Sequence, residues 1–165
     1  MLPLIISGLF LYLYYKTVYE KPIPLKKDKI EIAITNASRK YNIPKSWIKT
    51  IIKIESNFNP TLIGKAGEIG LMQIMRSTYK YHRSNRPISD LYDINKNVDF
   101  GTWYFSKYYK RFRKKFSQSE AVKRAVICYN AGIGYYKRTF LKTGRIPRIT
   151  RAYIKKFFKY QPKFV

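Results

Sequence analysis

Apolar residues recur along much of the chain with the spacing of amphipathic helices. From Asp28 they follow one another at the helical interval, which predicts a helix that ends near Tyr41, where the sequence "YNIP" breaks the pattern. Pro44 opens a second predicted helix. Its apolar stripe consists of Trp47, Ile48, Ile51 and Ile52.

The same reading predicts four further helices and one segment of another kind. A glycine-spaced segment with Gly64, Gly67 and Gly70 predicts a turn-rich excursion or a small hairpin. Gly132 stands where a C-terminal cap is expected after the third of the further helices. No alternating strand pattern and no internal repeat is present, so the fold class is mainly α. The four helices are predicted at residues 71–81, 95–116, 120–130 and 150–160.

The N-terminus is apolar and uncharged from residue 2 to residue 15. We interpret residues 1–19 as an uncleaved membrane anchor helix, with a cleaved signal as the alternative, because no basic residue precedes the run and no small-residue cleavage site follows it. Residues 20–27, with two prolines, predict a linker, and residues 28–165 one domain. Lysines after the run favour a cytoplasmic location for that side, which conflicts with a substrate outside.

The formal net charge of +25 is the strongest compositional signal. Such a field attracts polyanions, and the candidates are nucleic acid, anionic lipid and anionic polymers of a bacterial envelope. Lysine exceeds arginine, and Ile, Tyr and Asn are abundant, as an AT-rich coding sequence would give, so we disfavour nucleic acid. The single Cys128 and the single His82 exclude a multi-cysteine metal site, and no metal or cofactor is predicted.

One carboxylate breaks the apolar stripe of the second predicted helix. Glu55 lies four residues after Ile51 and three after Ile52, where a core-facing helix should present an aliphatic side chain. Desolvation and the negative end of the helix dipole should raise its pKa, which suits a general acid. By spacing alone, a group that reaches solvent or pairs with a lysine remains the commoner interpretation.

Four sequence blocks change that balance. They are "ESNFNP" from Glu55, "GLMQIM" up to Met75, "YNAG" from Tyr129 and "PRITRAYI" from Pro147. In this order and at about this spacing, over residues 45–160, they resemble the soluble lytic transglycosylase family of peptidoglycan-cleaving enzymes. Each block alone is a weak signal, whereas their combination is specific.

The resemblance implies a lysozyme-like α+β domain, mostly helical, whose cleft binds the glycan strand of peptidoglycan. It implies cleavage between N-acetylmuramic acid (MurNAc) and N-acetylglucosamine (GlcNAc) with a 1,6-anhydro product, and it makes Glu55 the single catalytic acid and base. Gln73 would bind an N-acetyl or hydroxyl group, and Met75 would pack on a sugar or in the core. Tyr129 and Asn130 would close the other side, with the Tyr129 hydroxyl orienting Glu55.

Other positions are assigned lesser roles or depart from the family pattern. Ser56 is expected to brace the Glu55 backbone more than to touch substrate, and Tyr153 is a weaker cleft candidate. Gly64 replaces a serine that the family often has, and Arg76 replaces a proline, although Arg76 can still begin a helix. Glu68 is expected to be a solvated turn residue.

Several functions stay open at this point. The leading one is a membrane-anchored lytic transglycosylase on the cell-wall side of the membrane, for local wall opening by a phage or by a secretion or conjugation machine. A virion or envelope-spanning complex is a possible partner. The alternatives are a hydrolytic lysozyme of the goose type, a binding-only murein module, and a basic nucleic-acid binder, which would leave the four blocks unexplained.

Overall fold

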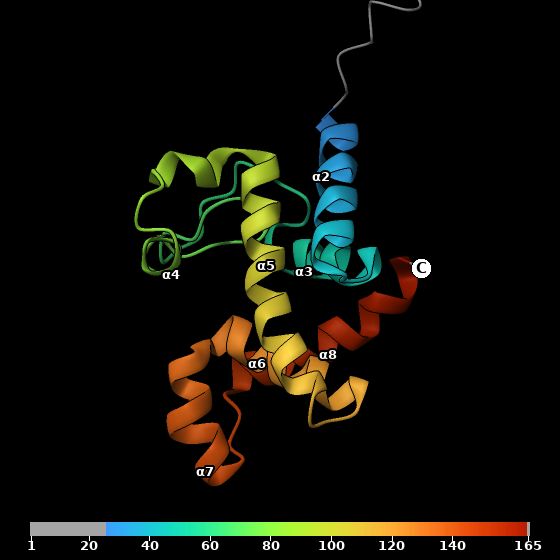
Figure 1. The fold of residues 1–165 in the computed structure, drawn as a ribbon, viewed down its shortest axis with the longest axis vertical. Helices are drawn as coiled ribbons and strands as arrows, with labels where there is room; N and C mark the ends of the chain where they lie inside the picture. The colour runs from blue at the N-terminus through green and yellow to red at the C-terminus, as the bar shows by residue number, and fades with distance from the viewer. Residues whose placement is uncertain (1–25, 165) are drawn as a thin grey trace, which may run out of the picture.

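A computed structural model describes residues 26–164 of the protein, so the predicted anchor at residues 1–19 and most of the linker lie outside the described residues. The described part is mainly helical, as predicted (Figure 1). The longer helices are α2 (Lys26–Tyr41), α3 (Lys45–Ser56), α5 (Ile94–Arg113), α6 (Gln118–Tyr135) and α8 (Arg148–Tyr160). The shorter elements are α4 (Arg76–His82), the 3-10 turn η1 (Ile88–Tyr92), the π turn η2 (Tyr136–Phe140), α7 (Leu141–Thr143) and the 3-10 turn η3 (Gln161–Phe164).

Helix α5 forms the central column of the molecule, with α2 packed along it and α6 against its other end (Figure 1). Helix α3 packs against α2, α8 and η3. Its buried Trp47 makes edge-to-face contacts with Phe105 and Tyr109 of α5 and with Phe157 of α8, at ring centroid distances of 6.3, 5.0 and 6.4 Å. This aromatic cluster ties the start of α3 to α5 and α8.

The apolar stripes that the sequence predicted on α2, α3 and α6 are confirmed. Ile34 of α2, Ile48 and Ile52 of α3 and Ala125 of α6 are fully buried. Cys128 of α6 is fully buried too, as expected for a small apolar residue, and burial raises the pKa of its thiol to about 12. The core is thus built from the faces that the helical spacing selects.

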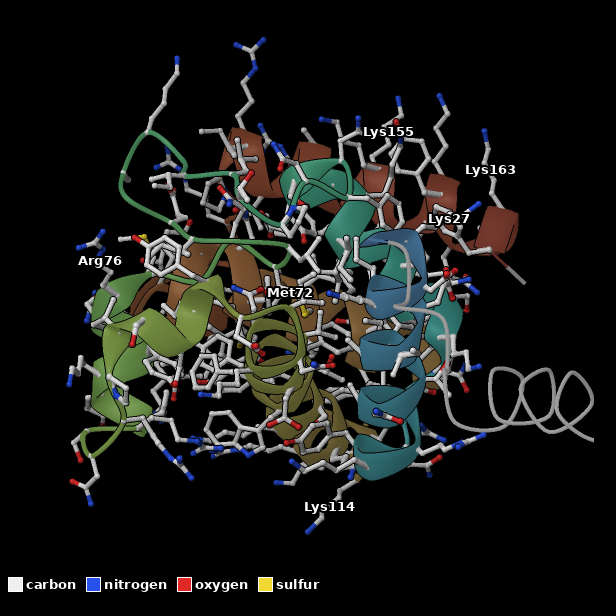
Figure 2. All side chains as sticks on the ribbon, turned by 90° about the horizontal axis from the view of Figure 1, so that it is seen from above. Lys27, Met72, Arg76, Lys114, Lys155 and Lys163 are labelled. Carbon is white, nitrogen blue, oxygen red and sulfur yellow. The ribbon has the colours of Figure 1, made fainter. Side chains whose placement is uncertain are left out.

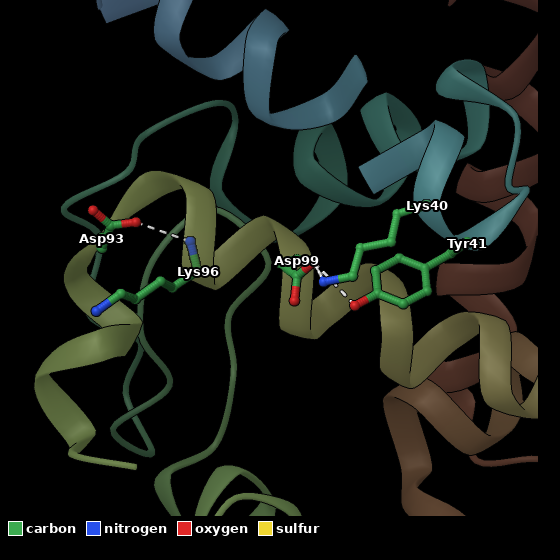
Figure 3. Close-up of polar contacts among 5 residues, drawn as sticks. All are labelled: Lys40, Tyr41, Asp93, Lys96 and Asp99. Atoms are coloured by element: carbon green, nitrogen blue, oxygen red, sulfur yellow. Dashed lines mark hydrogen bonds and ion pairs between the residues drawn. The ribbon is translucent and has the colours of Figure 1, made fainter. Parts of the chain in front are cut away.

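Two polar contacts fix the N-terminal half of α5 (Figure 3). The Asp93 side chain caps the helix by accepting from the Lys96 backbone N–H at 2.9 Å. One turn further on, Asp99 Oδ1 accepts from Lys40 Nζ at 2.6 Å and from the Tyr41 hydroxyl at 3.0 Å, both at the end of α2. The stretch of α5 between these contacts is therefore held in place against α2.

The glycine-spaced segment is a compact hairpin-like loop, as predicted, and contains isolated bridges but no full strand. Ile69 forms antiparallel bridges with Ile63 and with Ile74. Gly70 has a φ of 79° and Gln73 a φ of 44°, in the left-handed region. The loop therefore continues to Met75, and α4 begins only at Arg76.

The prediction of a helix from residue 71 was wrong in its first five residues. Residues 71–75 are apolar at helical spacing, but the left-handed Gln73 and the mutual hydrogen bonds of Ile69 and Ile74 are incompatible with a helix. Arg76 does begin α4, as expected.

Gly132 has the positive φ expected of a cap, 83°, but it kinks α6 instead of ending it. The helix resumes to Tyr135 and continues through η2 and α7 before Gly144 closes it. The helical segment from Gly132 to Gly144 was not predicted from the sequence; it lies at the lower left of Figure 1.

No helix within residues 26–164 combines the length and the apolar character needed to cross a membrane.

Candidate active site

Glu55 occupies the last turn of α3, where the helix ends at Ser56. The chain then leaves the helix through Asn57 and Phe58, both with positive φ, at 51° and 64°. The side chain follows the buried Ile51 and Ile52 on the same stripe, so the core face of α3 continues directly into a carboxyl group. Glu55 is consequently half-buried.

Burial raises the pKa of Glu55 to about 7. The hydrogen bond from Tyr153 opposes this rise, and the negative charge of Glu68 adds to it. The direction and main cause predicted from the apolar stripe are therefore confirmed. A carboxyl group with this pKa is partly protonated at neutral pH and can both give up and take back a proton.

The partner of Glu55 is Tyr153 of α8, whose hydroxyl donates to Glu55 Oε1 at 2.8 Å. Burial raises the pKa of Tyr153 well above its usual value, so its hydroxyl stays a donor. The prediction that Tyr129 would orient Glu55 directly was wrong, because the Tyr129 hydroxyl donates to the Met72 carbonyl at 2.7 Å. Tyr129 is nonetheless close, since the charge of Glu55 helps to raise the pKa of Tyr129.

Four of the predicted site residues line one hollow of about 230 Å³ between the loop and α6. Met75 is 37% exposed at its wall, so its side chain is not simply core. Asn130 Oδ1 accepts from Thr150 Oγ1 at 2.7 Å, which links α6 to the start of α8. The four residues are Gln73, Met75, Tyr129 and Asn130.

A comparison with protein families agrees with this geometry. The family model described as "Transglycosylase SLT domain" matches residues 32–150, most of the chain and all but the last of the four sequence blocks in full. The chain belongs to the transglycosylase SLT family. The resemblance noted from the sequence is thereby confirmed.

Two curated relatives of this SLT domain illustrate its range. The membrane-bound lytic murein transglycosylase C of Photorhabdus laumondii is 36% identical over 115 residues, which cover 65% of this chain and 32% of the relative. The membrane-bound lytic murein transglycosylase E of Buchnera aphidicola subsp. Acyrthosiphon pisum is 29% identical over 154 residues, 85% of this chain and 70% of the relative. The chain thus spans about a third of the length of the first relative.

Solved structures show the same fold. The 70-kDa soluble lytic transglycosylase of Escherichia coli matches with a TM-score of 0.66 and 25% identity, over 81% of this chain and 24% of the other. A lytic transglycosylase of Pseudomonas aeruginosa matches with the same TM-score and 23% identity, over 81% of this chain and 23% of the other. The SLT domain therefore accounts for the helical fold around Glu55.

The loop of this SLT domain is held against α5 by Asn97, which sequence reasoning missed. The side chain is buried and accepts from the Met72 backbone N–H at 2.9 Å, while its amide nitrogen donates to the carbonyls of Ile69 and Leu91 at 2.9 and 2.8 Å. Met72 is also the residue whose carbonyl holds the Tyr129 hydroxyl. The only signal in the sequence is an asparagine on a helix face that is otherwise apolar.

Ser56 is buried next to Glu55 and braces the backbone there, as the sequence predicted. Its hydroxyl lies 3.1 Å from the Ile52 carbonyl and 2.9 Å from the Leu71 carbonyl, so it joins the end of α3 to the loop. Its side chain is 4% exposed, which leaves the substrate contacts to other residues.

Gln73 and Glu68 complete the loop side of the site. The Gln73 amide nitrogen donates to the carbonyls of Leu62 and Gly70 at 3.0 and 2.9 Å, which leaves the amide oxygen for other contacts. Glu68 lies in the turn, as expected, but it is half-buried, and its charge acts on Glu55. The expected turn position of Glu68 is thus confirmed, and its partial burial was not foreseen.

Proposed function

We propose that the protein is a peptidoglycan lytic transglycosylase that cleaves the β-1,4 bond between MurNAc and GlcNAc and leaves a 1,6-anhydroMurNAc end. The observation that supports this most directly is Glu55, with its pKa raised to about 7 and with Tyr153 bound to one oxygen. The names of the curated relatives, lytic murein transglycosylases C and E, point to the same reaction.

Glu55 serves as acid and base in turn. Its protonated carboxyl gives a proton to the glycosidic oxygen, so the C–O bond breaks and the GlcNAc side leaves as an alcohol. The resulting carboxylate then takes the proton of the muramoyl 6-hydroxyl while that oxygen bonds to C1 of the same sugar. The Tyr153 hydroxyl stabilises the carboxylate stage by a charge-assisted hydrogen bond, and Glu55 ends the cycle protonated again.

The sugar binds in this hollow. Glu55, Ser56 and Tyr153 do not line it, but Tyr129 does, and the charge of Glu55 acts on Tyr129. The Gln73 and Asn130 side chains are among the polar groups that line it, and Met75 offers an exposed thioether to a sugar face. Tyr129 lines this hollow, and its hydroxyl donates to the Met72 carbonyl of the loop.

Mass spectrometry of the muropeptides that the full chain releases from purified peptidoglycan tests this function. Anhydro products, lighter by one water than hydrolysed ones, are expected. Reducing-end products would replace the proposal by a lysozyme, and binding without products would replace it by a murein-binding module.

Hydrolysis is the second candidate because Glu68 supplies a second carboxylate near Glu55. Glycoside hydrolases commonly use a pair of carboxylates, one of which activates water. The product masses separate the two reactions.

We further propose that the enzyme acts on the wall side of a membrane to which it is anchored. Both curated relatives are named membrane-bound, and the apolar run at residues 2–15 has the composition of an anchor. Helix α8 adds a basic outer surface without any acidic residue. This α8 surface consists of the exposed Arg148, Arg151, Lys155, Lys156 and Lys159.

The α8 surface points away from the site that the inner face of the same helix completes. Figure 2 shows Lys155 and Lys163 projecting from one edge of the molecule, with Lys27 near them and Lys114 at the opposite edge. The exposed Ile149 and Phe158 accompany the cations on α8. An anionic lipid surface matches this combination of cations and apolar side chains.

Local opening of the wall, by a phage during entry or lysis or by a secretion or conjugation machine, is the context in which we place this activity. A Glu55→Gln protein distinguishes an enzyme from the remaining alternatives, which only bind. An enzyme loses cleavage and keeps murein binding, whereas a nucleic-acid binder keeps all of its affinity for nucleic acid.

A further inference from the structure

Gly64 is a glycine for reasons of space. It is absent from the positive-φ residues of the described chain, so its backbone conformation does not require glycine. A Cβ atom at this position would lie 2.2 Å from Glu68 Oε2 and 2.6 Å from Gln73 Oε1. The volume in which a side chain of residue 64 would begin is therefore occupied by two oxygen atoms from elsewhere in the loop.

The loop fixes both oxygen atoms. Glu68 Oε2 accepts from the Ala66 backbone N–H at 3.0 Å, and the Glu68 carbonyl accepts from the Gly64 N–H at 2.8 Å. The Gln73 amide nitrogen is bound to two loop carbonyls, which directs its oxygen toward Gly64. Within residues 26–164 no protein donor binds Gln73 Oε1, and the Ala66 N–H is the only donor on the Glu68 carboxylate.

Two acceptors that converge in this way call for a donor from outside the protein. Glu68 and Gln73 are held rigidly, so they cannot turn apart to solvent without breaking the loop contacts. Of the two, Gln73 also lines the hollow with Met75, Tyr129 and Asn130, so the acceptor pair is joined to the hollow through Gln73. Hydroxyl and acetamido N–H groups are the donors that a glycan carries in abundance.

We propose that Glu68 is a second carboxylate of the active site, which forms with Gln73 Oε1 an acceptor pair for a hydroxyl or acetamido N–H of the glycan. This deepens the proposed function and rests on it for the identity of the ligand. The effect of the Glu68 charge on the pKa of Glu55 agrees with this placement.

The groups that face Glu55 define what Glu68 contributes. Tyr153 from α8 donates to Glu55, and Tyr129 from α6 lies near it, but both are neutral phenols at any pH at which the domain works. Glu68 is the only charged group whose field is identified at Glu55, and it favours the protonated form. The Glu68 charge thereby increases the fraction of Glu55 that is protonated before the substrate binds.

The first test measures the Glu55 carboxyl directly by ¹³C NMR titration of the full chain and needs no substrate. In Glu68→Gln the pKa of Glu55 is expected to fall. The matched control is Glu31→Gln, which makes the same change in net charge at a carboxylate that pairs with Lys49 and leaves the pKa of Glu55 unchanged. An unchanged pKa in Glu68→Gln would mean that Glu68 does not lie near Glu55 and would overturn its place in the active site.

The second test measures affinity in the Glu55→Gln background, which cannot cleave. Binding of a soluble tetrasaccharide of alternating GlcNAc and MurNAc is expected to weaken about tenfold in Glu68→Ala, as for the loss of one charge-assisted hydrogen bond. Equal affinity of the two proteins overturns the acceptor pair.

The third test uses the shared volume. Gly64→Ser alone should lower the melting temperature, because its Cβ meets the Glu68 carboxylate, and Glu68→Ala should remove most of that loss. Additive effects of the two changes would contradict the contact. If the wild-type chain releases no muropeptides while the pKa of Glu55 still follows Glu68, the proposed function fails and the coupling of the two carboxylates stands.

Discussion

The hydroxyl of Tyr153 lies 2.8 Å from Oε1 of Glu55, although 98 positions of sequence separate the two residues. Glu55 ends α3 and Tyr153 lies on the inner face of α8, so the acid and its donor come from two helices that pack on each other. Burial raises the pKa of Glu55, and the hydrogen bond from Tyr153 lowers it. The two effects together set the fraction of Glu55 that is protonated at a given pH.

Tyr153→Phe should raise the pKa of Glu55 further, because the one hydrogen bond within residues 26–164 that favours the carboxylate is lost. The alkaline limb of the pH profile of kcat/KM, which requires protonated Glu55, should move to higher pH. At the same time kcat should fall about tenfold, since the carboxylate stage loses a charge-assisted hydrogen bond.

Tyr160→Phe is the control for Tyr153→Phe, because it removes a hydroxyl from the same helix away from Glu55. A Tyr153→Phe enzyme with the wild-type pH profile would show that the hydroxyl does not act on Glu55.

Glu55→Gln should abolish cleavage and stabilise the fold. Loss of a general acid and base costs about a hundredfold to ten-thousandfold in rate. The pKa of Glu55 is higher in the folded protein, at about 7, than its usual 4.5, so the wild type loses stability as pH rises through this interval. Glutamine carries no such cost, and the variant should be more stable by about 1 to 3 kcal/mol above pH 7.

Urea unfolding of wild type and Glu55→Gln at pH 4 and pH 8 measures this difference. The two proteins should be about equally stable at pH 4, where both side chains are neutral. A variant that is less stable at pH 8 would mean that the Glu55 carboxylate is well solvated in the fold.

Asn97→Ala should loosen the loop and lower both stability and activity. The substitution removes the partner that Asn97 gives to the buried Met72 N–H and Leu91 carbonyl, at a cost of about 3 kcal/mol, whereas the Ile69 carbonyl keeps its bond from the Ile74 N–H. Thermal unfolding measures the loss of stability, and kcat/KM on purified peptidoglycan measures how the loosened loop affects activity.

Asn95→Ala is the matched control for Asn97→Ala, because Asn95 is exposed on the same turn of α5. Equal melting temperatures for the two variants would exclude Asn97 as the support of the loop.

Replacement of Lys155 and Lys159 by glutamate should weaken binding to vesicles with anionic lipid. Each basic residue near such a surface contributes about 1 kcal/mol, and the effect should fade as salt is raised. Co-sedimentation with anionic and with neutral vesicles measures it.

The control for the α8 surface is Lys114→Glu with Lys115→Glu, since Lys114 lies at the opposite edge of the molecule (Figure 2). Equal losses in both double variants would mean that net charge, and not the α8 surface, governs binding. Cleavage of a soluble glycan should not change in either variant.

The sequence predicted those parts of the fold that follow from local periodicity. The stripes of α2, α3 and α6 were recognised because each is amphipathic by itself. The raised pKa of Glu55 followed from the same argument, since its neighbours on the stripe are apolar. The four blocks identified the family, and with it the residues that line the hollow.

The parts that were missed depend on contacts between distant segments. The start of α4 was misplaced because nothing local shows that Gln73 is left-handed, a conformation held by the loop and by Asn97 of α5. Tyr129 was assigned the contact that Tyr153 makes, since both are aromatic residues in family blocks and only the packing of α8 on α3 distinguishes them. The proposed role of Glu68 depends on the missing side chain at Gly64, whose place the Glu68 and Gln73 oxygens take.

The buried thiol of Cys128 can be used to measure local opening of the domain. Its thiol is fully enclosed within α6, and the pKa of about 12 leaves almost no thiolate at neutral pH. Since the chain has no second cysteine, an alkylating reagent finds a target only while α6 is detached from the core. The labelling rate therefore measures how often the native domain opens.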